Sequence, residues 1–397
     1  AVARQTLGRP AQRMEVEASG NIIKNVKSVF VPNTGGLRGI PAAAAAGMAA
    51  GDPALELEVL SSIGEGEQAA IRQYLADTPI AVKLADSPFI FDIVIRAWAG
   101  EDSALVRIVN YHTNIVRVER NGQVLKEVEA QAAAEEGLTD KSVLTVEGIL
   151  EFAREAALAD VEDAVGRQVR YNTAIAQEGL RGDYGANIGK VLLATYGDDV
   201  KIRAKAMAAA GSDARMNGCG LPVVIVSGSG NQGLTASLPV VEYAKELGAD
   251  WETTLRAVLV SDLITIHLKA EIGRLSAYCG AVSAGCGSGA GIAWLYGREK
   301  EPQALLKDVS HTIVNALAVD SGIVCDGAKA SCAAKIASAV DAGLLGFYMY
   351  QNGQQFRGGD GIISKGVEET IRNIGLLATQ GMRETDREIL DIMTTRC

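Results

Sequence analysis

The 397-residue sequence is poor in aromatic side chains, which make up 5% of it, and it contains only three histidines. Three scattered histidines do not form a histidine-based metal site. An excess of positive charge is also missing, because 38 Lys and Arg stand against 48 Asp and Glu, for a net charge of −10. Binding to nucleic acid or to an anionic membrane surface needs clustered cations, so neither partner is expected.

Unbroken apolar segments are missing as well. Two uncharged runs, from Arg215 to Glu242 and from Arg274 to Arg298, exceed the roughly 20 residues that span a bilayer, but polar residues and glycines interrupt both. The first residues, AVARQTLGRP, carry charge and no apolar stretch, so no signal peptide is expected. Six cysteines in such a long chain indicate thiols or metal ligands in a cytoplasmic protein, not a disulfide framework.

The length predicts two domains, and the strand and helix patterns within them predict α+β architecture. Residues 1–135 are expected to form an N-terminal α/β domain with a mixed sheet, and Asn121-Gly122 is a strong hairpin signal. Its strand candidates are 15–32, 80–86, 89–99, 104–122 and 123–130, and its helix candidates are 41–52 and 65–76. A polar connection, 131–142, ends this domain.

From residue 143 the apolar period changes to 3.6, which predicts a mostly helical domain over 136–397. Thr145 is a plausible N-cap for the first of its helices. The expected helices are 145–180, 187–196, 198–210, 235–248, 251–270, 302–319, 328–342 and 363–379.

Two glycine-rich loops could hold an anion through backbone N–H groups. SGSGNQG (227–233) follows the apolar run LPVVIV and precedes a helix expected to begin near Thr235. It lacks the Gly-Lys-Ser/Thr of a P-loop and the spacing of a dinucleotide fingerprint. PNTGGLRG (32–39) is a second such loop. An ordinary glycine-rich turn explains either loop about as well as a binding role.

The three histidines have different sequence surroundings, and different roles are expected for them. His112, in YHTN, could act as a base or orient a substrate, whereas His267 on the apolar face of a helix is expected to be a satisfied core histidine. His311 is expected to be structural.

Soft ligands gather between Arg274 and Lys335, in RLSAYCGAVSAGCGSGAG and GIVCDGAKASC. These segments contain two Cys-x6-Cys pairs, Cys279/Cys286 and Cys325/Cys332. Neither spacing matches the Cys-x2–4-Cys pairs usual in zinc sites. Iron–sulfur ligation accepts looser spacing, with three thiolates and an open iron as one form. From spacing alone, a cluster and the alternative of buried, inert thiols both remain open.

Several blocks together resemble the L-cysteine desulfidase family, which is related to the alpha chain of iron–sulfur L-serine dehydratases. They run over nearly the whole chain: PNTGGLRG, YHTN, SDARMNG (212–218), SGSGNQGLTASLPVV (227–241), GRLSAYCG (273–280), AGIAWL (290–295), GIVCDGAKASCAAK (322–335) and MRETDREILDIM (382–393).

The resemblance implies a [4Fe-4S] cluster held by Cys279, Cys325 and Cys332, and β-elimination without pyridoxal phosphate. L-Cysteine would give pyruvate, ammonia and hydrogen sulfide; L-serine dehydration by the same mechanism is the alternative, and a non-catalytic iron–sulfur or amino-acid-binding protein is the third hypothesis. The site must bind and orient the substrate carboxylate. The candidate substrate-binding residues are Ser229, Asn231 and Gln232, with Lys24, Asn25, Arg38, His112 and Asn114 from the α/β domain.

The sequence departs from the family in one respect. The family carries a Gly-Cys-Thr-Glu-Pro motif whose cysteine is the proposed general base, and this motif is absent from the chain given, so the catalytic base stays unassigned. Cys219 and Cys286 fall outside the family pattern and are expected to be structural thiols. Cys397 is a candidate cap for the open iron, and a frayed chain end is the alternative that we favour. A homodimer is plausible from the Ala-rich composition.

Overall fold

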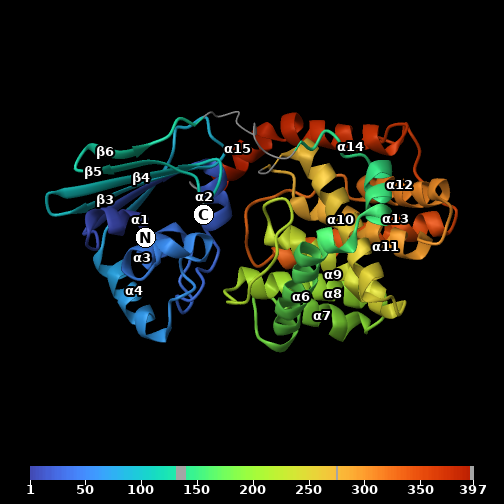
Figure 1. Cartoon of the computed structure of the whole chain (residues 1–397), viewed down its shortest axis with the longest axis horizontal. Helices are drawn as coiled ribbons and strands as arrows, with labels where there is room; N and C mark the ends of the chain where they lie inside the picture. The colour runs from blue at the N-terminus through green and yellow to red at the C-terminus, as the bar shows by residue number, and fades with distance from the viewer. Residues whose placement is uncertain (131–139, 274–275, 394–397) are drawn as a thin grey trace. The chain divides into compact units, whose positions relative to one another are not determined.

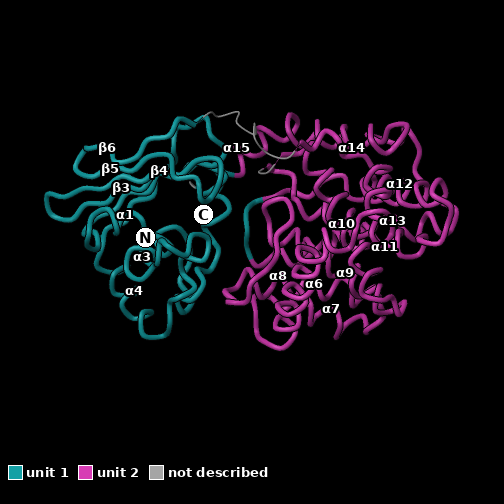
Figure 2. Tube along the Cα trace, viewed as in Figure 1, with its two compact units in different colours: residues 1–139, 326–329, 390–397 teal, residues 140–325, 330–389 magenta. Residues whose placement is uncertain are grey.

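The computed structural model describes residues 1–130, 140–273 and 276–393, and the chain divides into two compact units (Figures 1 and 2). Unit 1 comprises the described parts of 1–139, 326–329 and 390–397; unit 2 comprises those of 140–325 and 330–389. The sheet lies in unit 1 and unit 2 is helical, which confirms the α+β class. The chain leaves unit 2 directly after Cys325 and returns to it at Ala330.

Unit 1 is built on a six-stranded mixed sheet of order β2-β1-β3-β4-β5-β6, in which only β1 and β2 pair in parallel. Alternation along β1 buries Met14, Val16 and Ala18 on one face. Its elements are α1 (Val2–Leu7), β1 (Arg13–Ala18), α2 (Gly20–Val26), α3 (Gly39–Ala49), η1 (Pro53–Glu58), α4 (Glu65–Asp77), β2 (Ile80–Leu84), β3 (Asp92–Ala99), β4 (Asp102–Val109), β5 (Ile115–Arg120) and β6 (Gln123–Glu127).

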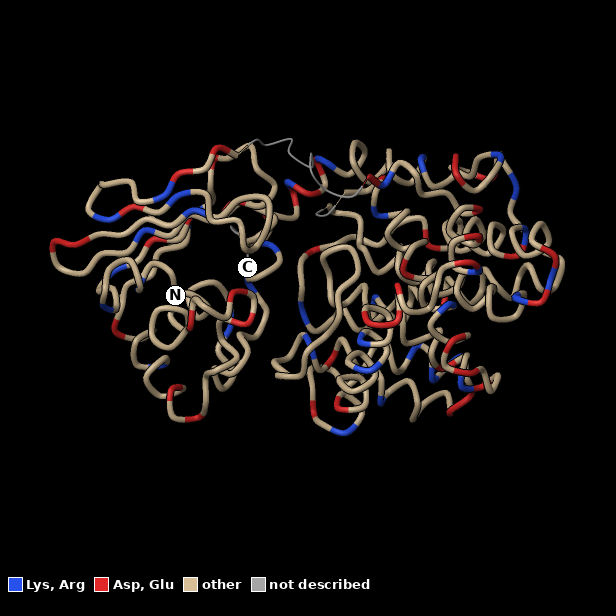
Figure 3. Tube along the Cα trace, viewed as in Figure 1, with Lys and Arg blue, Asp and Glu red and all other residues tan. Residues whose placement is uncertain are grey.

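The exposed face of this sheet is covered by ion pairs between neighbouring strands. Glu15 of β1 accepts from Lys83 of β2 at 2.6 Å, and Glu17 of β1 accepts from Arg96 of β3 at 2.5 Å. Figure 3 shows basic and acidic residues mixed along the strands in the same way. Cross-strand pairs of opposite charge stabilise a solvated sheet face modestly and help to set the register.

Two of the strand predictions for unit 1 are wrong. The run 15–32 is not one strand, because β1 ends at Ala18 and α2 follows. The run 104–122 contains two strands, since the chain turns at Asn110, whose φ of 65° is left-handed, and β5 starts at Ile115. The Asn121-Gly122 hairpin is confirmed, with φ of 52° and 78° joining β5 to β6.

Unit 2 consists of helices around one large apolar core. They are α5 (Val146–Glu155), α6 (Leu158–Arg181), α7 (Ile188–Tyr196), α8 (Val200–Met216), α9 (Gly230–Glu246), α10 (Trp251–Ile272), α11 (Gly280–Gly297), α12 (Pro302–Val319), α13 (Cys332–Gln351), α14 (Val367–Leu376), η2 (Leu377–Gly381) and α15 (Arg383–Asp391).

Three helix predictions in unit 2 need correction. The helix expected over 145–180 is two helices that break near Ala156, although Thr145 does cap the first by accepting from Gly148 N at 3.0 Å. Helix α9 begins at Gly230 and not at Thr235, and α13 begins at Cys332 and not at residue 328. Helix α11 has no counterpart among the predicted helices.

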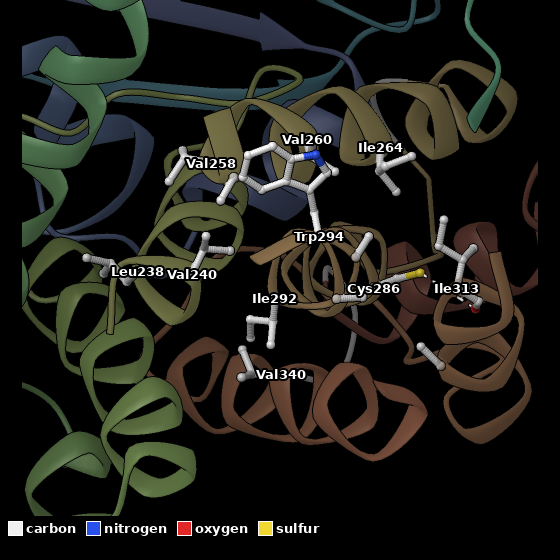
Figure 4. Packing of buried hydrophobic residues seen from close by; sticks show 14 of the residues in the cluster. Leu238, Val240, Val258, Val260, Ile264, Cys286, Ile292, Trp294, Ile313 and Val340 are labelled. Atoms are coloured by element: carbon white, nitrogen blue, oxygen red, sulfur yellow. Dashed lines mark hydrogen bonds between the residues drawn. The ribbon is translucent and has the colours of Figure 1, made fainter. Parts of the chain in front are cut away.

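Helix α11 is the central helix of unit 2, and small residues allow its neighbours to approach it closely. A Cβ on Gly285 would overlap the carbonyl oxygen of Ala339 in α13, and one on Gly289 would lie 2.6 Å from the oxygen of Gly343. Helix α11 also contributes Cys286, Ile292 and Trp294 to the core (Figure 4). Glycine weakens an isolated helix, so α11 owes its stability to this packing.

The same contacts give the helix directions. Residues 285 and 289 of α11 face 339 and 343 of α13, so these two helices run parallel, and their first residues, 280 and 332, lie at one end. Gly287 faces Ser261 and Thr265, and Gly291 faces Ala257, so α10 runs antiparallel to α11. The last turn of α10 therefore lies beside the first turn of α11.

We expect Gly285→Ala to lower the free energy of unfolding of unit 2 by about 1–3 kcal/mol, because the added methyl has no space against α13. Thermal unfolding measures the change. Gly66→Ala on α4 is the matched control: nothing lies within 4 Å of the added Cβ, and stability should stay equal or rise by up to about 1 kcal/mol. Equal stability of the two variants would contradict the packing described above.

By length and composition, α13 qualifies among the described helices as a membrane-span candidate. More than half of its apolar window is buried in the structure, and Ala333, Val340, Leu344 and Phe347 are in the core. These are the properties of a core helix in a soluble protein.

Candidate functional site

Two short segments of unit 2 place Cys279 and Cys325 side by side. Tyr278 and Val324 form an isolated antiparallel bridge. On either side of it, Cys279 N donates to Ile323 O at 2.9 Å and Cys325 N donates to Ala277 O at 2.6 Å. Backbone pairing thus joins two cysteines that are 46 positions apart in the sequence.

The N-termini of helices α11 and α13 place Cys332 at the same end of unit 2 as Cys279. Cys279 is the N-cap of α11 and Cys332 is the first residue of α13, and these parallel helices start at the same end of the unit. A helix N-terminus carries a partial positive charge and free N–H groups. Thiolates, or an anionic group bound to them, are therefore favoured at this end of unit 2.

The three thiols interact with one another. A hydrogen bond with Cys325, followed by burial and by the charges of Cys325 and Cys332, raises the pKa of Cys279 well above its ordinary value. The raised pKa favours the protonated form of the Cys279 thiol, and ligation of a metal would release that proton.

A [4Fe-4S] cluster suits this donor set in its chemistry. The described residues include no group of three or more His, Cys, Asp and Glu that could hold a single metal ion. In a four-iron cluster each thiolate binds a different iron, so its ligands stand farther apart than those of one ion. Three thiols that interact at the positive ends of two helices fit that requirement, and the cluster itself remains a proposal.

Lys269, on the last turns of α10, is a cation beside these thiols. Its side chain is only 4% exposed, and burial lowers its pKa to about 8, while Cys325 and Cys279 act in the opposite direction. The antiparallel packing of α10 on α11 explains why it lies at the cysteine end.

Arg215, near the end of α8, is a second cation at the site. Burial lowers its pKa, and the neighbouring Cys332 thiol opposes that change. Ala209 of α8 packs on Ala333 and Ala337 of α13, while Lys205 pairs with Asp341 at 2.7 Å, so α8 runs antiparallel to α13. This direction brings the end of α8 to the start of α13.

The first turn of α9 holds the three candidates from SGSGNQG. Ser229 is the N-cap and its Oγ accepts from Gln232 N at 3.5 Å. Asn231 Oδ1 accepts from Arg215 Nη1 at 3.2 Å. The Gln232 side chain is 5% exposed and lies against Gly280, where a Cβ would be 2.6 Å from its Cδ, and its Oε1 has no hydrogen bond among the described residues.

The other five candidate substrate ligands lie in unit 1. Lys24 and Asn25 are on α2, where the Asn25 amide donates to Asn21 O at 2.7 Å. Arg38 precedes α3 and its guanidinium stacks 3.7 Å from the Phe30 ring centroid. His112 and Asn114 are in the turn between β4 and β5, not within a strand, and Asn114 Nδ2 donates to Val109 O at 3.0 Å. Their roles in substrate binding stay predictions.

The remaining histidine and cysteine predictions can be compared with the structure. His267 is a satisfied core residue, as predicted, with Nε2 2.7 Å from Glu368 Oε2. His311 stacks on Tyr350 at 4.6 Å. Cys286 is buried in the core, with its thiol 3.7 Å from Ile313 O, which agrees with a structural thiol. Cys397 lies outside the described residues.

Sequence reasoning did not find Lys269 or Arg215. Both lie in helices that also bury apolar residues, and a charged residue on such a helix usually reaches solvent. The available signal was weak: Lys269 is a lone cation in the otherwise uncharged stretch LITIHLKA, and Arg215 begins the long uncharged run up to Glu242.

Comparisons with known proteins show the family of this chain. The model of the serine dehydratase alpha chain family matches residues 54–391. A UPF0597 protein of Desulfitobacterium hafniense (strain Y51) is 57% identical over 397 residues, covering 100% of this chain and 91% of that protein. UPF0597 proteins of Lachnoclostridium phytofermentans and Fusobacterium nucleatum are 50% and 43% identical, covering 99% of this chain in each case and 93% and 92% of their own lengths. The family relationship expected from the sequence motifs is therefore confirmed, and this chain belongs to the serine dehydratase alpha chain family, whose members are lyases of amino-acid catabolism.

Proposed function

We propose that this protein is a cytoplasmic, [4Fe-4S]-dependent lyase that converts L-cysteine and water to pyruvate, ammonia and hydrogen sulfide. The observation that carries the proposal is the meeting of Cys279, Cys325 and Cys332 at the positive ends of α11 and α13. A cluster bound by these thiols would supply an open, Lewis-acidic iron that makes the β-substituent a better leaving group.

The residues of unit 2 would contribute binding and orientation. The cysteine thiolates would hold the cluster, and the buried ammonium of Lys269 would balance their negative charge. The free N–H groups at the start of α9, with Ser229, Asn231 and Gln232, suit an amino-acid carboxylate. Held orientation supplies a large part of the rate of such a reaction. From unit 1 we retain Lys24, Asn25, Arg38, His112 and Asn114 as proposed ligands.

Dehydration of L-serine is the second candidate, and the match to the serine dehydratase alpha chain family favours it. It needs the same site and loses water in place of hydrogen sulfide. A soft iron–thiolate interaction favours the sulfur substrate, which is why cysteine is the first choice.

Anaerobic reconstitution with iron and sulfide tests the proposal. The protein should turn brown, with absorbance at about 400 nm from thiolate-bound iron. It should release sulfide and pyruvate from L-cysteine faster than it releases pyruvate from L-serine. Faster turnover of serine would replace the first candidate with the second. A colourless, iron-free protein after reconstitution would overturn both.

A further inference from the structure

The helical unit holds two cations, Lys269 and Arg215, at the cysteine end. No Asp or Glu forms an ion pair with Lys269 or Arg215 among the residues that the structure describes, although other cations of unit 2, such as Lys245 and Arg256, have such partners. Removing a cation from water without an anionic partner is unfavourable. The two charges therefore indicate two anions at this end of the unit.

The surroundings of the two cations differ. Lys269 interacts electrostatically with two of the three thiols, Cys325 and Cys279. Arg215 interacts electrostatically with the third thiol, Cys332, and its guanidinium also contacts the first turn of α9. There it crosses Gly230, where any Cβ would overlap Arg215 Nε, and donates to Asn231 Oδ1 at 3.2 Å.

Gln232 lies at the same place and supplies the second observation. Its buried Oε1 lacks a hydrogen bond among the described residues, and its side chain contacts Gly280, the residue after Cys279. The amide thus has hydrogen-bonding capacity left between the start of α9 and the cysteines. A buried polar group without a partner is uncommon and is expected to meet a ligand or water.

We infer that Arg215 binds the carboxylate of the substrate at the N-terminus of α9, whereas Lys269 serves the thiol ligands. The inference rests on the proposed elimination reaction and adds the ligand class that the subsite selects: thiols that carry a carboxylate. A guanidinium matches the two oxygens of a carboxylate in geometry, and the helix N-terminus adds favourable charge.

Binding of two small thiols, one with a carboxylate and one without, tests whether Arg215 binds the carboxylate. 3-Mercaptopropionate has a thiol and a carboxylate, and cysteamine has a thiol and an amine but no carboxylate. Anaerobic titration calorimetry should show 3-mercaptopropionate binding to the iron-loaded protein more tightly than cysteamine. Arg215→Met should weaken binding of 3-mercaptopropionate by about 10–100-fold, the usual effect of losing a charge-assisted pair, and should leave cysteamine binding unchanged.

Arg167→Met is the matched control, because Arg167 lies on the exposed face of α6 and pairs with Asp163 at 3.0 Å. Arg215→Lys should recover part of the lost affinity. Equal binding of 3-mercaptopropionate by wild type and iron-loaded Arg215→Met would overturn the inference. Loss of iron from Arg215→Met would also overturn it, since Arg215 would then support the metal ligands.

The same titrations on iron-free protein keep the two proposals distinguishable. If wild type takes up no iron, the proposed function fails. A weaker affinity of iron-free Arg215→Met than of iron-free wild type for 3-mercaptopropionate would still support the carboxylate subsite, and equal affinities would reject it.

Discussion

Replacing Cys279, Cys325 or Cys332 with alanine, one at a time, is expected to remove bound iron and to lower lyase activity by at least about three orders of magnitude, as for catalytic groups that act as a unit. Each thiol is a separate ligand in the proposed site, and two thiolates do not retain a four-iron cluster firmly. Iron and sulfide analysis after anaerobic reconstitution, with the visible spectrum, measures the loss.

Cys286→Ala is the control for these variants. Cys286 is buried in the middle of α11, seven positions after Cys279, and its thiol donates to Ile313 O at 3.7 Å. We expect a modest loss of stability, about 1–2 kcal/mol from the lost packing, and full iron content. Iron loss in Cys286→Ala, or iron retention in any one of the three proposed ligand variants, would show that the ligand set is wrong.

Lys269→Met is expected to reduce retention of iron by about 10–100-fold, the range seen when a group that supports metal ligands is removed. The ammonium is buried and interacts with Cys325 and Cys279, so its loss leaves one cation fewer to balance the negative charge of the thiolates. The assay is iron remaining per chain after timed exposure to a chelator under anaerobic conditions.

Lys269→Arg keeps the charge and should retain most of the iron, whereas a purely steric role would not distinguish Met from Arg in this way. Lys201→Met serves as the control, since Lys201 is exposed on α8 and pairs with Asp199 at 3.3 Å. Wild-type iron retention in Lys269→Met would remove Lys269 from the site.

Local sequence patterns were enough to predict much of the secondary structure of unit 1. The helix expected over 65–76 is α4, and the Asn121-Gly122 turn joins β5 to β6. The errors have local causes too: the pattern of 15–32 continues past Ala18 although the backbone becomes helical, because hydrophobic alternation over a few residues does not separate a strand from a short amphipathic helix.

Helix α11 shows where local patterns fail. Its sequence GAVSAGCGSGAG contains residues that are poor helix formers, so propensity predicts no helix there. In the folded unit, Gly285 and Gly289 allow the α13 backbone close to α11, and the packing gained outweighs the poor propensity. Such a helix depends on partners more than 40 residues away in sequence.

The family and the α+β class could be predicted from the sequence and are confirmed, because motifs and composition are local properties of the chain. The sequence also singled out Cys279, Cys325 and Cys332, whose role as ligands stays a prediction. Which charges lie near those cysteines could be seen in the tertiary structure alone. Lys269 and Arg215 reach them because α10 and α8 run antiparallel to the helices that begin at Gly280 and Cys332. Helix direction follows from the packing of the whole unit, and no short segment of sequence contains it.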